Sequence, residues 1–320
     1  EELPPFRTIV TEERPRRMIT RNQSPDVPFD RSLNPYRGCE HGCIYCFARP
    51  GHSYLGMSPG LDFETRLVAR PAAAEVLERD LQRRSYRPAV IALGTATDPY
   101  QSIEARYGIT RACLEVLRDY RHPVGVVTRG TLVERDVDVL AEMAAMGLAH
   151  VGITVTTLDA GLARKLEPRA PSPARRLKMI ATLAQAGVPV RVNVSPIIPG
   201  LSDDGIEAVM EAARGAGAAR ASWVMLRLPL EVSELWRDWL DAHYPDRKAK
   251  VMARLRDMHG GREYAPDWGH RMRGEGHYAQ MIAHRFKLAQ RRLGLDAELP
   301  ELRTDLFRVP PRPGDQLSLF

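Results

Sequence analysis

Apolar runs rich in valine and isoleucine alternate along this chain with amphipathic stretches of helical spacing. The apolar runs occupy residues 88–94, 123–128, 149–155, 188–194 and 220–226. The helical stretches occupy residues 71–84, 109–120, 131–146, 172–186 and 203–216. Continuous apolar strands of this length suit a parallel sheet that is buried on both faces. With the segment before Cys39 as a first strand, the pattern predicts an α/β fold, a partial (βα)6 barrel of the TIM type.

The rest of the chain divides around this barrel, which we assign to residues 31–228. Residues 1–30 predict a polar N-terminal arm, residues 229–307 a basic helical region, and residues 308–320 a proline-rich linker with a terminal peptide. The 320 residues are 44% hydrophobic and 27% charged, which excludes wholesale disorder. No apolar run approaches the roughly 20 residues that span a bilayer, and the charged N-terminus is unlike a signal peptide. We therefore expect a cytoplasmic protein.

Three of the four cysteines, Cys39, Cys43 and Cys46, fall within eight residues after the first predicted strand. Loops this short strain a disulfide, and metal ligation is the better interpretation in a reducing compartment. Three thiolates can hold an iron–sulfur cubane and leave one iron without a protein ligand, as a catalytic metal site requires. The alternative is a structural zinc ion whose fourth ligand is His41 or His52.

In a barrel of this kind the chemistry gathers on the loops after the carboxyl ends of the strands. The cysteine loop lies there, as do residues 95–101, 128–130, 154–160 and 195–203. The spacing C-x3-C-x2-C, with Phe47 after the third cysteine, resembles the radical S-adenosylmethionine (SAM) superfamily. This resemblance implies one 4Fe–4S cluster on the three cysteines, with SAM bound at the open iron. An electron donor such as flavodoxin or ferredoxin would reduce the cluster, and SAM would yield a radical that abstracts a substrate hydrogen.

Residues 34–50, 60–65 and 97–101 resemble an uncharacterised bacterial branch of the spore photoproduct lyase-like proteins, whose lyase repairs a thymine dimer in DNA. The resemblance implies that Thr97 and Asp98 bind the amino end of SAM, and that Arg129 stands where the lyase has a lysine near the SAM carboxylate. Further implied SAM contacts are Phe47, Thr154, Thr156, Asn193, Ser195 and Ile197. The alternative for these later residues is a purely local role at a strand end.

One departure from the lyase concerns the hydrogen-atom donor. The lyase has a cysteine near the end of its second strand, whereas Thr95 or its neighbour occupies that position here. The remaining donor candidates are Tyr100 and Cys113, although the apolar neighbours of Cys113 favour a buried core thiol. Dimer reversal by the lyase mechanism is therefore not implied.

Positive charge is concentrated in residues 245–293, which hold twelve lysines and arginines against five acids, while the whole chain has a net charge of +6. Aromatic residues interleave with these cations, a combination that suits unpaired nucleotides. A second cluster follows the fourth barrel strand. Our candidate nucleic-acid contacts are Arg164, Lys165, Arg262, Tyr264, Trp268, Arg271, Arg273 and Tyr278. The alternative is a solvated helix face whose aromatic residues point into the core.

The last five residues, Gln316, Leu317, Ser318, Leu319 and Phe320, resemble the peptide by which bacterial repair proteins engage the DNA sliding clamp. The leading hypothesis is thus a radical SAM enzyme, lyase-like, that repairs or modifies DNA and is recruited by the clamp. A radical SAM enzyme acting on RNA or a small nucleotide is the second hypothesis. A zinc-stabilised DNA-binding clamp adaptor without catalysis is the third.

Overall fold

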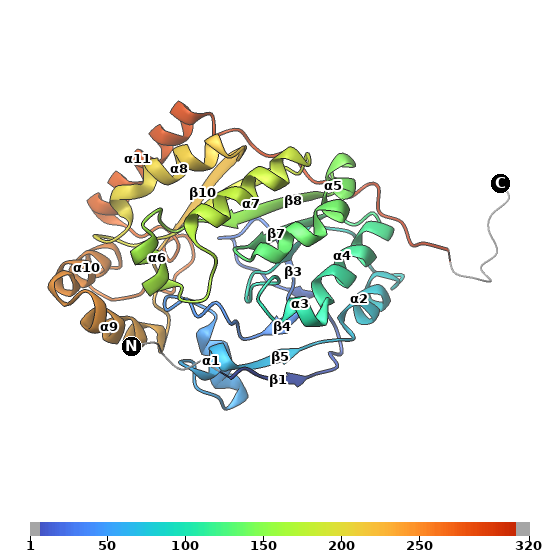
Figure 1. Ribbon diagram of the computed structural model, residues 1–320, viewed down its shortest axis with the longest axis horizontal. Helices are drawn as coiled ribbons and strands as arrows, with labels where there is room; N and C mark the ends of the chain where they lie inside the picture. Colours follow the sequence, from blue (N-terminus) through green and yellow to red (C-terminus); the bar gives the residue numbers. More distant parts are fainter. Residues whose placement is uncertain (1–6, 312–320) are drawn as a thin grey trace.

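A computed structural model describes residues 7–311 (Figure 1), and its largest element is a seven-stranded sheet in the order β10-β9-β8-β7-β6-β3-β2. Six neighbouring strands run parallel: β3 (Arg31–Leu33), β6 (Ile91–Leu93), β7 (Val124–Thr128), β8 (Ala149–Thr154), β9 (Val190–Ile197) and β10 (Arg220–Met225). The sheet does not close, because β10 and the antiparallel β2 (Thr20–Arg21) form its two edges. The predicted partial barrel of six βα units is confirmed.

Five helices line one side of this sheet, as Figure 1 shows. They are α2 (Ala73–Leu81), α4 (Ile109–Asp119), α5 (Val137–Ala145), α7 (Pro173–Gln185) and α8 (Ile206–Gly215). Each lies within a predicted helical stretch, and short 3-10 turns at Thr131–Asp136 and Asp203–Gly205 precede α5 and α8. The start of α7 follows from its sequence, because the Ser172 hydroxyl accepts from the Arg175 N–H and Pro173 occupies the first turn. The shorter helices α3 (Glu104–Tyr107) and α6 (Ala160–Leu166) were not predicted.

A second, three-stranded sheet supports the cysteine loop, and the sequence pattern did not reveal it. Its order is β1-β5-β4, formed by β1 (Ile9–Glu12), β5 (Arg66–Ala69) and β4 (Tyr36–Arg37). Strands of two to four residues are too short for an alternating pattern to identify them. Strand β4 leads directly into the cysteine loop, and the α1 turn (Asp62–Thr65) and a 3-10 helix (Arg49–Leu55) flank that loop.

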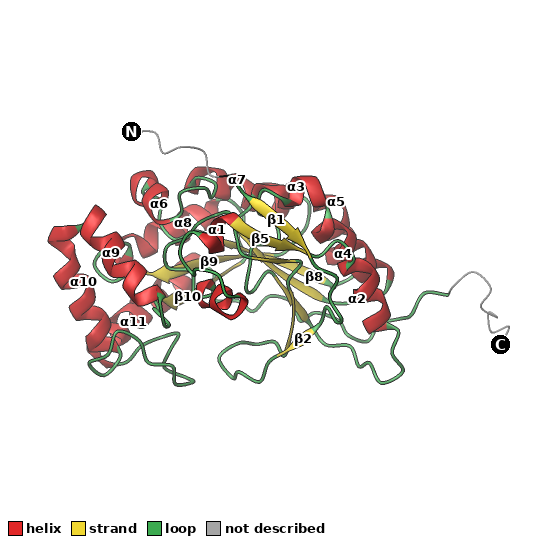
Figure 2. Cartoon of the chain, turned by 90° about the horizontal axis from the view of Figure 1, so that it is seen from below, coloured by secondary structure: helices red, strands yellow, loops and turns green. Residues whose placement is uncertain are grey.

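Beyond the barrel the chain forms α9 (Val232–His243), α10 (Pro245–Met258) and α11 (Gly276–Leu293). Figure 2 shows these helices gathered at one end of the molecule, and α11 packs against both α8 and α10. The aromatic ring of Trp236 stacks on that of Trp239, which holds the face of α9 toward the core. Among residues 7–311, no helix combines the length and the apolar character that crossing a membrane requires.

Candidate active site

The cysteine loop is organised around a buried arginine three residues after its last cysteine. Arg49 is 1% exposed, and its guanidinium donates to the main-chain oxygens of Cys43 at 3.0 Å and Gly42 at 3.2 Å. The same group pairs with Glu64 at 2.5 Å. A buried guanidinium is stable only with such a full set of acceptors, so the loop and Arg49 hold each other in place.

Gly42 lies at the tightest point of this loop. Its φ of +68° is a left-handed conformation that suits glycine, and an added Cβ would lie 2.7 Å from a carboxylate oxygen of Glu64. The Arg169 guanidinium also pairs with Glu64 and donates to the Glu40 oxygen at 2.5 Å. The loop is therefore enclosed by charged groups that fix its backbone.

The three thiols of the loop lie near one another and form no disulfide. Cys39 and Cys43 are each 7% exposed, and Cys46 is half-buried. Burial raises the pKa of Cys43 to about 12 against the opposing charge of Arg129, with Glu167 and then Cys46 adding to the rise. Burial followed by Asp98 and Cys43 raises the pKa of Cys39. The raised pKa favours the protonated thiol, and bound iron reverses this preference because a coordinated thiol loses its proton.

The donor set fits an iron–sulfur cubane. Within residues 7–311, no three His, Cys, Asp or Glu side chains are placed to share a single metal ion. Each cysteine of a cubane binds a different iron, so three neighbouring thiols need not converge on one point. His41 and His52 are both engaged elsewhere, His41 with Asp98 at 3.4 Å and His52 with the Arg66 oxygen at 2.9 Å.

Asp98 joins the cysteine loop to the loops after β6 and β7. Its carboxylate accepts from the Thr128 hydroxyl at 2.6 Å, the Arg129 main-chain N–H at 2.8 Å and the Tyr100 N–H at 2.9 Å. Burial raises the pKa of Asp98, but the adjacent His41 and these donors outweigh it and lower that pKa to about 2. Asp98 is thus a charged carboxylate whose oxygens hold three loops together.

Arg129 places a positive charge on the cysteine loop. Its Nη1 donates to the Cys43 Sγ at 2.8 Å, the Tyr45 hydroxyl at 2.9 Å and the Glu167 carboxylate at 3.0 Å. Arg176 pairs with the other Glu167 oxygen. Burial raises the pKa of Glu167, while Arg176 and then Arg129 lower it to about 2. A buried ionic network therefore meets the cysteine loop at Cys43.

Thr156 and Ser195, two of the predicted SAM contacts, lie in the same network. The Thr156 hydroxyl lies 2.9 Å from a Glu167 oxygen and 2.9 Å from the main-chain oxygen of Ser195. The Asn193 amide oxygen accepts from Arg191 at 3.1 Å and from Ser222 at 2.7 Å. Thr156 and Ser195 thus belong to the network that meets the cysteine loop, whereas Asn193, in the middle of β9, bonds to neighbouring strand residues.

The other predicted SAM contacts differ in their surroundings. The Thr97 hydroxyl donates to the Tyr36 oxygen at 3.0 Å, and Thr154 is buried beneath Arg176. Ile197 is a core residue at 1% exposure. Phe47 is 45% exposed, and the Arg227 guanidinium lies 4.0 Å from its ring centroid.

The two hydrogen-donor candidates are both enclosed. Tyr100 is 1% exposed, and burial followed by Asp136 raises the pKa of its hydroxyl. Cys113 lies in the core on α4 at 0% exposure, and burial followed by Glu104 raises its pKa.

The candidate nucleic-acid residues fall into two groups. Three use their polar or cationic group within the protein: Arg271 pairs with Asp26, Tyr278 donates to Asp203, and the Lys165 ammonium lies 4.5 Å from the Tyr244 ring centroid. The others lie at least partly open to solvent: Arg164, Arg262, Tyr264, Trp268 and also Arg273, whose guanidinium lies over the Trp223 ring. Trp268 is 57% exposed.

Four residues that build this site were not predicted: Tyr45, Arg49, Glu167 and Arg176. Arg49 and Tyr45 flank the third cysteine, and their closeness in sequence to the cysteines was the available signal. Glu167 meets Arg129 across 38 positions of sequence, and no local pattern indicates that pairing.

Comparison with known proteins identifies the family of this chain. A family model described as the radical SAM superfamily matches residues 33–213. This chain belongs to the radical SAM superfamily. Its cofactors are accordingly a 4Fe–4S cluster and SAM, which decides against the zinc hypothesis.

Two sequence relatives and one solved structure are similar to this chain over two thirds of its length or more. An uncharacterised protein of Mycobacterium tuberculosis is 35% identical over 242 residues, covering 75% of this chain and 70% of the relative. One from Methanocaldococcus jannaschii is 26% identical over 218 residues, covering 67% and 76%. A solved structure of a spore photoproduct lyase mutant with bound AdoMet and dinucleoside spore photoproduct superposes with a TM-score of 0.64 at 13% identity, covering 89% of this chain and 79% of that one.

Proposed function

We propose that Cys39, Cys43 and Cys46 hold the cluster and that this radical SAM enzyme acts on DNA, repairing or modifying a damaged nucleotide. The observation that carries the DNA proposal is the concentration of positive charge in residues 245–293, a segment with twelve lysines and arginines and only five acidic residues. Radical SAM chemistry itself requires no such charge, whereas a polyanionic substrate does. The superposed spore photoproduct lyase structures add support, since one is complexed with a dinucleoside lesion.

With both cofactors bound, the family's chemistry supplies a 5′-deoxyadenosyl radical that takes a hydrogen atom from the substrate. The chain's own residues prepare the site. Arg49 fixes the loop backbone, and Arg129 presents its cation to the Cys43 sulfur while Glu167 balances that charge. Asp98 holds the loops after β6 and β7 against the cysteine loop. The site is thus rigid where the cofactors bind.

The test is an isotope transfer. Reduced, reconstituted enzyme is incubated with SAM and with damaged oligonucleotides that carry deuterium on the base or the sugar. Deuterium in the 5′-deoxyadenosine is the expected result, and its labelled origin identifies the abstracted position. Vigorous SAM cleavage without transfer from any DNA probe would refute the DNA proposal. Transfer from matched RNA in place of DNA would favour the second hypothesis.

We also propose that the terminal peptide, Gln316 to Phe320, recruits the enzyme to the sliding clamp; it lies outside the residues that the structure describes. Its support is the sequence, in which three large apolar residues, Leu317, Leu319 and Phe320, follow a proline-rich segment. Leu319 and Phe320 would fill an apolar pocket, and the linker would tether the enzyme near DNA. Deleting residues 316–320 should abolish clamp binding in a pull-down while SAM cleavage is retained. Equal clamp binding by the truncated protein would refute this.

A further inference from the structure

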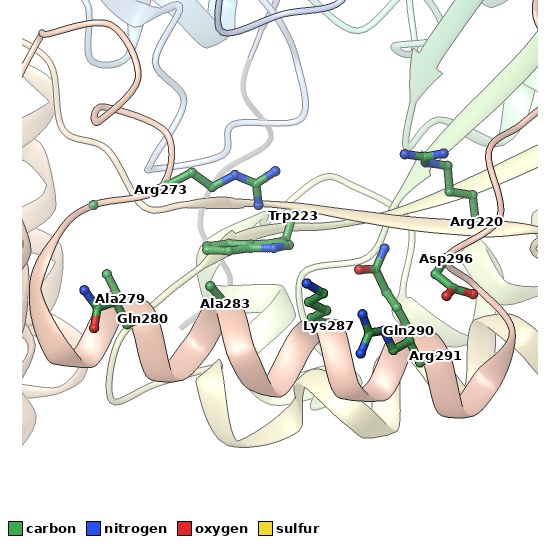
Figure 3. A pocket seen from close by; sticks show the side chains of 11 residues that line it. Arg220, Trp223, Arg273, Ala279, Gln280, Ala283, Lys287, Gln290, Arg291 and Asp296 are labelled. Atoms are coloured by element: carbon green, nitrogen blue, oxygen red, sulfur yellow. The ribbon is translucent and has the colours of Figure 1, made fainter.

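A pocket of about 520 Å³ lies between the edge strand β10 and helix α11, outside the cysteine site (Figure 3). Its floor contains Trp223 of β10, and its walls carry Arg220 on the strand with Lys287 and Arg291 on the helix. Arg273, in the loop before α11, lies over the Trp223 ring at 4.2 Å. The pocket is hence a groove along the open edge of the partial barrel, and we call it the edge groove.

Of the four cations that line the edge groove, three form no ion pair with a carboxylate of residues 7–311. Arg273, Lys287 and Arg291 are exposed, and no carboxylate within residues 7–311 forms an ion pair with any of them. Arg285, on the same helix, differs because Glu207 pairs with it at 2.7 Å. Arg220 is partnered by Glu298, and Asp296 is the acid that lines the groove. Three uncompensated cations along one groove indicate an anionic ligand from outside the chain.

The main-chain edge of β10 is already occupied, which argues against an added peptide strand. The Ala221 N–H donates to the Leu295 oxygen at 3.1 Å, and the Met225 N–H donates to the Met272 oxygen at 2.9 Å. The Gln290 amide also donates to the Ala221 oxygen at 2.9 Å. A peptide would need those same groups for strand addition. Recognition in the groove must therefore depend on side-chain charge.

Trp223 serves as a support and offers no stacking surface. It is 7% exposed, with the Arg273 guanidinium on its ring and Phe286 beside it at 5.9 Å between centroids. The cation–π contact restrains Arg273 in the groove before a ligand arrives. The cations are thus positioned before a ligand binds, and a nucleic-acid ligand would contact them through its phosphates and not through its bases.

The groove has the length of a short nucleic-acid segment. Lining residues on α11 extend from Ala279 to Arg291, which is about 18 Å of helix, or roughly five stacked nucleotides of one strand. Because Met272 bonds to Met225 at the carboxyl end of β10, Arg273 stands at the end nearer the barrel mouth. Arg220 marks the opposite end of the same strand. The groove thus leads away from the mouth.

We propose that the edge groove binds the sugar–phosphate backbone of single-stranded DNA that flanks the substrate nucleotide. This inference rests on the proposed DNA substrate and adds the path that the strand follows. The groove is bounded by one β-strand and one helix. Phosphate contacts of this kind position the chain without reading its sequence.

The test compares two double variants. Lys287→Ala/Arg291→Ala removes two groove cations, and Arg17→Ala/Arg84→Ala removes two exposed arginines that do not line the groove. Binding of a labelled single-stranded oligonucleotide is followed by fluorescence anisotropy across a salt series. The groove variant should bind roughly tenfold more weakly, and its slope of log K against log salt should fall by about 1.4, or about 0.7 for each lost phosphate contact.

The control variant should change both quantities far less, and both variants should retain dithionite-dependent SAM cleavage. An equal loss in the two variants would mean that only general charge matters, which overturns the groove. Wild-type protein that binds no oligonucleotide would instead overturn the DNA proposal itself. Normal wild-type binding that the groove variant retains in full rejects the edge groove alone.

Discussion

Asp26 and Arg271, 245 positions apart, form an ion pair in which the arginine Nε lies 2.5 Å from the carboxylate Oδ2. Asp26 lies between β2 and β3 at one edge of the large sheet, and Arg271 precedes the residue whose oxygen bonds to β10 at the other edge. The Gly269 N–H donates to the same carboxylate at 2.6 Å. The pair therefore spans the open side of the partial barrel.

Breaking this pair should loosen the two segments that it joins. Arg271→Ala is expected to increase amide hydrogen exchange in residues 22–30 and 264–275, because the Arg271 side chain links these two loops through Asp26 and Ser24. Exchange in β7 and β8 should be unchanged. Arg303→Ala, which removes an exposed pair with Asp305, serves as the control. Unaltered exchange in both loops of Arg271→Ala would show that the pair does not hold them.

The cysteine assignment predicts a selective loss of iron. Cys43→Ala should leave the reconstituted protein without an intact cluster, because two thiolates cannot replace three. Cys113→Ala is the matched control, since it removes a thiol from the core of α4 at a distance in sequence from the loop. Iron and acid-labile sulfide are measured after anaerobic reconstitution. Full iron content in Cys43→Ala would exclude it as a ligand.

The barrel was predictable because its strands carry a local signal. The run 149–155 is rich in valine and isoleucine and became β8, Ala149–Thr154, since a buried parallel strand needs apolar residues on both faces. The small three-stranded sheet was not predictable, because a strand such as Tyr36–Arg37 is too short to show an alternating pattern. Within the site, the spacing of the three cysteines identifies them in the sequence. The role of Glu167 could not be predicted, because it depends on arginines that only the fold brings next to Glu167.

The buried network around Glu167 should be costly to break. Glu167→Gln removes the charge that balances Arg129 and Arg176, and it leaves one buried and one half-buried guanidinium group without their anion. We expect the free energy of unfolding to fall by about 3–5 kcal/mol, as for other broken buried pairs. Glu75→Gln, which disrupts an exposed pair with Arg14, should cost less than about 1 kcal/mol. Urea unfolding measures both, and equal values for the two variants would contradict a buried ionic role.

Acid should destabilise the fold through His122. The imidazole is fully buried, with Nε2 2.6 Å from the Tyr86 hydroxyl and Nδ1 3.0 Å from the Pro123 oxygen. Burial lowers the pKa of His122 to about 4 and outweighs the Pro123 contact, which favours the charged form. In the unfolded chain the same group binds a proton below a pH of about 6.5.

The direction of the effect follows from these two values. Above a pH of about 6.5 the group is neutral in both states, and it adds no pH dependence. As the pH falls from there toward 4, only the unfolded chain takes up the proton, so the stability decreases by roughly 3 kcal/mol in total. His122→Gln cannot titrate and should lose less stability over this range than the wild type. The exposed His277→Gln should follow the wild-type curve. The measurement is the urea midpoint of unfolding at each pH. If the midpoints of His122→Gln and of the wild type fall in parallel as the pH decreases, the acid sensitivity belongs to other groups.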